Sequence, residues 1–179
     1  MKAKWIGGAT LAGAVLALAC GEGRVIFDVD VFSFLSAGAD TIHYTVPLVI
    51  TDSVKNTPIK VNLPGGLGKS AVDSVTLSGT AKIINNTGSG NVTFKIFIDT
   101  SSATTYSRTP FVSTGGPVGP GSTTTPISAN ATVLGDSRFL NQTLWVGVEA
   151  MVAATAAPID GKVQITALRL RVVLKPKLF

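Results

Sequence analysis

The chain has 179 residues, with 15 basic and 10 acidic side chains and a formal net charge of +5. Charged residues make up 14% of the chain, well below the ~25% typical of soluble domains, and the basic residues lack the runs and interleaved aromatics of a nucleic-acid-binding surface. The single cysteine excludes an internal disulfide and a cysteine-based zinc site. This composition favours an exported protein with a polar, weakly charged surface and no nucleic-acid partner.

Residues 1–19 have the three parts of an export signal. Lys2 and Lys4 form a basic front, residues 5–19 form an uncharged apolar run, and the small residue Ala19 closes it. Signal peptides need these parts in this order. The run is shorter than the ~20 apolar residues of a membrane-spanning helix. We therefore expect residues 1–19 to be a signal peptide that the mature chain lacks.

The segment Leu16-Ala-Leu-Ala-Cys20 resembles the processing site of bacterial lipoproteins, although Ala17 stands where that family usually has leucine. The resemblance implies that Cys20 becomes the first mature residue and carries the lipid, with residues 20–23 as a short tether to the membrane. It also implies a location in the cell envelope, and Gly21 in place of aspartate favours the outer membrane or the cell surface. In the alternative, an ordinary signal peptidase cuts nearby and leaves Cys20 as a free thiol.

After the tether, apolar and polar residues alternate. Val25, Phe27 and Val29 lie on one side of the first such run, and Asp28 and Asp30 lie on the other. A period of two residues is typical of a half-buried strand. The runs that we expect to contain strands are residues 24–35, 41–51, 57–63, 72–84, 91–99, 126–134, 142–153 and 161–175.

About eight short strands separated by turn-forming residues predict an all-β protein. We expect one antiparallel β-sandwich over residues 24–179, either jelly-roll or immunoglobulin-like. Residues 136–142 are expected to include one helical turn. Residues 113–126 are rich in glycine and proline, which favours a long exposed loop.

The last predicted strand carries charge on one face. Arg169 and Arg171 alternate there with leucine residues, and the first strand carries Asp28 and Asp30 on its polar face. If these two strands are neighbours, each cross-strand pair of opposite charge contributes about 0.2–1 kcal/mol. We therefore name these four residues as a possible strand-pairing site.

Few residues suggest chemistry. His43 is the only histidine, and the pattern around it places it on the polar side of its strand. Trp145 and Glu149 share one strand face, where an indole could stack on a sugar ring while the carboxylate binds a hydroxyl; packing of Trp145 in the core is the alternative. The residues suggest no catalytic group, metal site or cofactor, so we do not expect an enzyme.

Three functions are compatible with these observations. The first is a lipid-anchored envelope protein with a non-enzymatic structural or interaction role, whose partners would be the membrane, other envelope proteins, itself or glycans. The second is a subunit of an extracellular filament or surface assembly that is joined by β-strand addition through residues 24–35. The third is a carbohydrate-binding module that uses Trp145 or residues 113–126.

Overall fold

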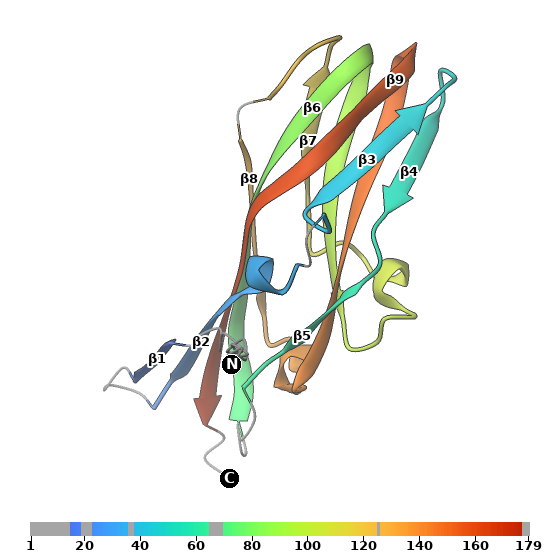
Figure 1. Ribbon diagram of the computed structural model, residues 1–179. Helices are drawn as coiled ribbons and strands as arrows, with labels where there is room; N and C mark the ends of the chain where they lie inside the picture. Colours follow the sequence, from blue (N-terminus) through green and yellow to red (C-terminus); the bar gives the residue numbers. More distant parts are fainter. Residues whose placement is uncertain (1–14, 19–22, 36–37, 65–69, 125, 177–179) are drawn as a thin grey trace, which may run out of the picture.

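The computed structural model describes residues 15–18, 23–35, 38–64, 70–124 and 126–176, and it is built from antiparallel β-strands (Figure 1). Three single turns of 3-10 helix, η1 (Val31–Phe34), η2 (Thr105–Ser107) and η3 (Ser137–Leu140), connect them. The strands are β1 (Val15–Leu18), β2 (Val25–Asp30), β3 (Thr41–Val46), β4 (Thr51–Lys55), β5 (Ile59–Asn62), β6 (Ser70–Asp99), β7 (Val112–Val118), β8 (Ile127–Leu134) and β9 (Thr143–Pro176).

Two long strands, β6 and β9, form the centre of the molecule. They pair antiparallel along their length, from Ser70 opposite Pro176 to Asp99 opposite Trp145. Irregularities of the pairing are concentrated where residues 85–90 of β6 face residues 154–161 of β9, and there both strands bend over together (Figure 1). β-Bulges permit such a bend because they interrupt the ladder locally. Each long strand therefore contributes one half to each of two layers.

The remaining strands flank these halves. In the first layer, β2 and β3 pair with the second half of β9. The other edge of this half pairs with the first half of β6, which in turn pairs with β8. In the second layer, β4 and β5 pair with the first half of β9. The other edge of this half pairs with the second half of β6, which in turn pairs with β7. To compare this order with known sandwiches, β1 is left out, β2–β3 and β4–β5 count as one strand each, and each half of β6 and of β9 counts as one strand. Numbered from 1 to 8 along the chain, these strands lie in the order 1-8-3-6 in the first layer and 2-7-4-5 in the second. This is the jelly-roll arrangement, so the sandwich prediction is confirmed and the immunoglobulin-like alternative is wrong.

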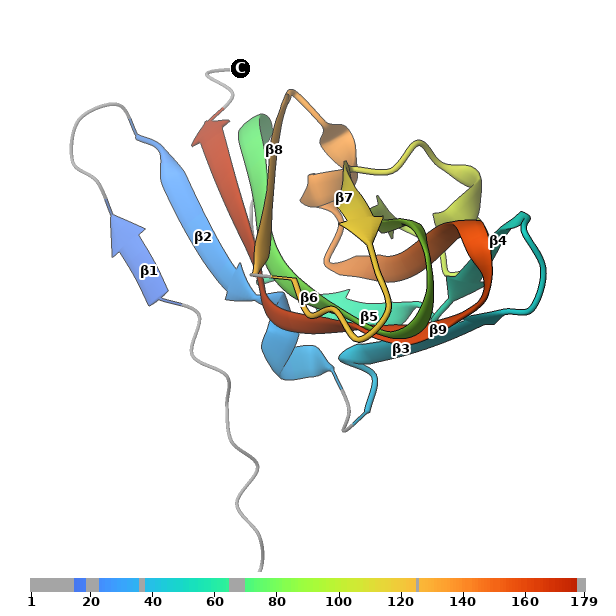
Figure 2. The ribbon, with the colours of Figure 1, turned by 90° about the horizontal axis from the view of Figure 1, so that it is seen from above.

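The core lies between the two layers, and β9 shows how alternation builds it. Leu144, Val146 and Val148 point inward from the second layer, and Leu168 and Leu170 point inward from the first; each is at most 1% exposed. Their neighbours along the strand face outward because successive side chains of a strand point to opposite sides. Figure 2 shows the two layers closing around this interior.

The prediction of a loop over residues 113–126 is wrong in its first half. Residues 112–118 form strand β7, which pairs with β6 from Val112 opposite Ile96 to Val118 opposite Gly90. Glycine is required in this strand, because a Cβ atom at Gly115 would lie 2.1 Å from the carbonyl oxygen of Val92. β7 is also an edge strand of its layer, a position at which a proline such as Pro117 is tolerated.

Other predicted boundaries shift. The strand expected over residues 24–35 ends at Asp30 and continues as η1, and the one expected over 41–51 ends at Val46 before a turn that leads into β4. The helical turn expected at residues 136–142 is confirmed as η3, and the Asp136 carboxylate caps it by accepting a hydrogen bond from the Arg138 amide at 3.0 Å. Within the described ranges, the structure has no helix of the length and apolarity that a bilayer crossing requires.

Candidate interaction surface

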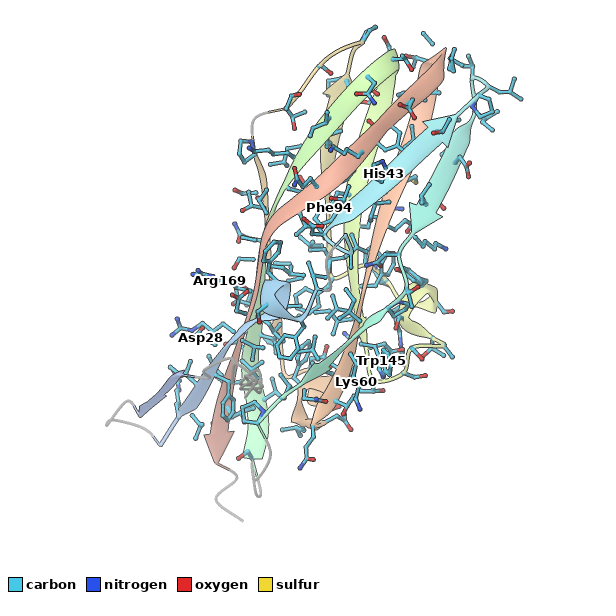
Figure 3. All side chains as sticks on the ribbon, viewed as in Figure 1. Asp28, His43, Lys60, Phe94, Trp145 and Arg169 are labelled. Atoms are coloured by element: carbon cyan, nitrogen blue, oxygen red, sulfur yellow. The ribbon has the colours of Figure 1, made fainter. Side chains whose placement is uncertain are left out.

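The four charged residues predicted to pair lie on neighbouring strands. In the register of β2 and β9, Asp28 is directly opposite Arg171, and Asp30 is directly opposite Arg169. Phe27 points into the core, so the aspartates point away from it, and both are exposed. Figure 3 shows Asp28 and Arg169 on the outer side of this layer. The structure thus places opposite charges across the strand pair, as the hypothesis required.

These pairs continue across the layer as polar rows. Arg171 is opposite Thr76, which is opposite Thr132, and the two threonine hydroxyls are 2.9 Å apart. The neighbouring row continues from Arg169 through Ser78 to Asn130. We call this surface the polar face; it consists of Asp28, Asp30, Thr76, Ser78, Asn130, Thr132, Arg169 and Arg171.

Two open hollows border Arg169 on the polar face. One, of about 210 Å³, is lined by Asp28, Val29, Asp30 and Arg169. The other, of about 230 Å³, lies over β6 and β8 and is lined by Ser78, Gly79, Thr80, Ser128, Asn130, Ala167 and Arg169. Guanidinium donors beside carboxylate, amide and hydroxyl groups can hydrogen-bond a polar chain or group that lies across the layer.

The other edge of β2 is covered by β1. Their antiparallel register runs from Val15 opposite Asp28 to Leu18 opposite Val25. In Figure 2, β1 lies at the rim of the first layer, on the side of β2 that faces away from β9. β1 belongs to the predicted signal peptide, and the predicted lipidation site, Cys20, lies outside the described residues.

Trp145 and Glu149 occupy the outer side of the second layer, where the two side chains differ in how far they are buried. Trp145 is half-buried and lies directly opposite Lys60 of β5 (Figure 3). Glu149 is only 8% exposed, and its Oε2 atom lies 4.0 Å from Nζ of Lys95. The carboxylate is therefore engaged within the protein.

Tyr106, which the sequence did not single out, lies over the strand between these two residues. A Cβ atom at Gly147 would be 2.8 Å from Cζ of the Tyr106 ring. A sugar ring would have to displace Tyr106 to contact Trp145 and Glu149 together. The glycine in an otherwise apolar strand is the signal that could have indicated a covering ring.

Hydrogen bonds hold Tyr106 in this position. Its hydroxyl lies 2.6 Å from Oδ1 of Asn56 and 3.0 Å from the carbonyl oxygen of Val148, and it accepts from the amide of Val148 at 3.1 Å. The ring also packs edge-on against Phe97, with centroids 5.2 Å apart. Burial raises the pKa of Tyr106 to about 12, a shift that the amide of Val148 opposes and Glu149 reinforces. Tyr106 is therefore a neutral, structural residue.

His43 is exposed on β3 opposite Lys162, as its position in the pattern predicted. The nearby Asp160 accepts hydrogen bonds from Asn86 and Thr45, which lower the pKa of its carboxyl. Across the described residues, histidine, cysteine and acidic side chains do not gather in groups of three or more that could hold a metal ion.

No protein-family model matches this chain, and no curated protein matches it. Among solved structures, it is similar to those of infectious bursal disease virus Gt strain, at 11% identity and a TM-score of 0.37, and Gx strain, at 8% and 0.37. These similarities cover 95% and 97% of this chain but only 38% and 43% of the viral chains. The chain therefore spans less than half the length of either structure, and the jelly-roll assignment rests on its own strand register.

Proposed function

We propose that this chain is an exported, lipid-anchored protein of the cell envelope with a non-enzymatic structural or interaction role. The observation that supports the proposal is the short spacing along the sequence between Cys20 and the first core strand. β2 begins at Val25, five residues after Cys20, and five extended residues reach at most ~18 Å. A lipid on Cys20 would therefore hold this end of the jelly roll close to the bilayer.

The same arrangement leaves most of the polar face available for a partner. Its rows of hydroxyl, amide and guanidinium groups surround two open hollows rather than an enclosed pocket. Open polar surfaces of this kind bind macromolecules more readily than small substrates, which prefer enclosed apolar pockets. An interaction role is therefore the function that the geometry supports best.

Metabolic labelling with an alkyne fatty acid tests the anchor. We expect the exported protein to be labelled, to sediment with membranes and to begin at Cys20 by mass spectrometry. The Cys20→Ser variant should be unlabelled, and its folded fraction should not change because Cys20 lies before the first core strand. An unlabelled wild-type protein whose mature form begins beyond Cys20 contradicts the proposal.

Assembly by strand addition is the second candidate. The pairing of β2 with β9 of its own chain counts against the expected donation of residues 24–35 to a neighbour. Assembly is favoured by the edge of β2 that faces away from β9. In this chain that edge pairs with β1, which belongs to the segment that processing would remove.

A further inference from the structure

We infer that, in the processed protein, the outer edge of β2 binds an extended apolar segment of another envelope protein, which adds to the first layer antiparallel to β2. The inference rests on the proposed function in one respect, because that function requires removal of residues 1–19. The observation that supports the inference is the pairing of β1 with β2.

The edge is a strand-binding site by its geometry. Four consecutive residues of β1 pair with residues 25–28 of β2, so the backbone of β2 is straight and regular enough to bind a second strand on this side. Once β1 is gone, N–H and C=O groups along this edge lose their partners. Such an edge is a template for pairing with another chain.

The side chains of β2 define the chemistry of the incoming strand. Phe27 and Val29 are 5% and 8% exposed at the rim of the core, and Val25 packs against it only partly buried. Apolar residues opposite these positions would extend the core. Asp28 lies on the other face, where Arg171 already opposes it, so the partner needs no basic residue there. The expected segment is apolar at alternate positions and uncharged or polar between them.

A second copy of β2 does not fit this edge when both chains are anchored. In a symmetric antiparallel pair, the two β2 strands enter from opposite ends. The jelly roll extends from the tether end of β2 in one direction (Figure 1), so the second copy would extend toward the bilayer. A tether of at most ~18 Å cannot reverse that orientation. The geometry therefore favours a segment of a different protein.

The far edge of the same layer provides an internal comparison. β8 (Ile127–Leu134) is eight residues long and carries no charge, which makes it the other candidate for pairing. However, β8 contacts β7 of the opposite layer, so part of its rim is closed by the sandwich itself. Among the described strands, β2 pairs only with β9 and β1, so its outer edge has no other strand to cover it once β1 is absent.

Disulfide trapping on the exported protein tests the inference. The probe is a synthetic peptide of residues 13–19 with two lysines added for solubility and Ala17→Cys. Ala17 is directly opposite Ile26, and directly opposite residues of an antiparallel pair point to the same face. The probe should therefore form a disulfide with the Ile26→Cys variant. A peptide with Leu18→Cys instead, and a protein with Thr132→Cys on β8, are the matched controls.

We expect at least a tenfold higher yield of the first disulfide than of either control. In the unsubstituted protein, the unsubstituted peptide should slow amide hydrogen exchange in residues 25–30 at least tenfold. Equal trapping by both peptides, or protection of β8 rather than β2, overturns the inference. A symmetric dimer through β2 that excludes the peptide also overturns it.

Intact mass of the same samples separates this inference from the proposed function. If residues 1–19 are retained, the anchor proposal fails, and the edge is then expected to be filled by β1. The Ala17→Cys, Ile26→Cys double variant of the retained chain should form an internal disulfide. Absence of that disulfide, with β2 amides unprotected, shows that the edge does not accept a strand at all.

Discussion

The ring of Tyr106 packs directly on the backbone of Gly147, at a distance that leaves no room for a Cβ atom. The η2 segment thereby covers the outer side of the second layer, and the hydroxyl of Tyr106 bonds across to Asn56 and Val148. The contact joins three segments that are distant in the sequence.

Gly147→Ala is therefore expected to destabilise the fold. The added methyl would lie 2.8 Å from the Tyr106 ring and 2.9 Å from Cγ2 of Thr105, and overpacking of this kind costs about 1–3 kcal/mol. Urea denaturation measures the change. Gly116→Ala is the matched control, because nothing lies within 4 Å of its Cβ position. Equal stability of the two variants would show that the η2 segment moves freely.

Asn85 is expected to stabilise the bend of β6. It is 1% exposed, accepts a hydrogen bond from the Tyr44 hydroxyl at 3.1 Å, and donates to the carbonyl oxygens of Gly88 and Gly119 at 3.0 and 2.8 Å. Asn85→Ala removes all three bonds and leaves the buried Tyr44 hydroxyl without this partner, so we expect a loss of at least ~2 kcal/mol in the free energy of unfolding.

Two variants control for this effect. Tyr44→Phe removes only one of the three bonds, so it should cost less than Asn85→Ala. Asn91→Ala changes an exposed asparagine of the same strand and should stay within about 0.5 kcal/mol of wild type. If Asn91→Ala and Asn85→Ala have equal effects, the bend does not depend on the Asn85 side chain.

Stability should decrease in acid through Asp99. Burial alone would raise the pKa of this carboxyl, but hydrogen bonds from Thr104, Arg108 and Thr100 outweigh it and hold the pKa below its ordinary value of 3.8. A pKa that folding lowers stabilises the native state fully above 3.8, and this contribution is lost as the pH falls through the folded value.

Asp99→Asn is expected to cost about 1.5–3 kcal/mol at pH 7, because the bonds to a charged acceptor are lost. The difference from wild type should shrink as the pH falls below 3.8. Urea denaturation between pH 7 and pH 2.5 measures it, with the exposed Asp52→Asn as control. A difference that is constant with pH would show that Asp99 is not charged in the native state.

Asp28 and Arg171 should interact measurably. Asp28→Arg places like charges opposite each other, and the Asp28→Arg, Arg171→Asp double variant restores the opposite pair. We expect a coupling energy of about 0.2–1 kcal/mol from the four unfolding free energies, decreasing at high salt because both side chains are exposed. A coupling energy of zero at low salt would show that the two charges do not interact.

Local alternation was sufficient to predict β2, β3, β5, β8 and most of β6 and β9, but not β4 or β7. It was also sufficient to predict the outward positions of Asp28, Asp30, Arg169 and Arg171. It was also sufficient to place His43 in solvent. These features depend on which of two faces a side chain occupies, and a period of two residues encodes that directly. Alternation along the chain was thus enough to predict an all-β protein with charged and polar residues on its outer faces.

The way the strands are joined depends on contacts that form only in the folded chain. Residues 113–118 read as a loop because their glycines and prolines resist strand formation, yet the close approach of Gly115 to Val92 makes them a strand. The predicted platform of Trp145 and Glu149 is covered by Tyr106, and β2 has a second edge that β1 covers. Each of these depends on contacts between residues far apart in the chain. Such contacts leave no local periodic signal, so only the folded chain determines which edges are paired and which faces are covered.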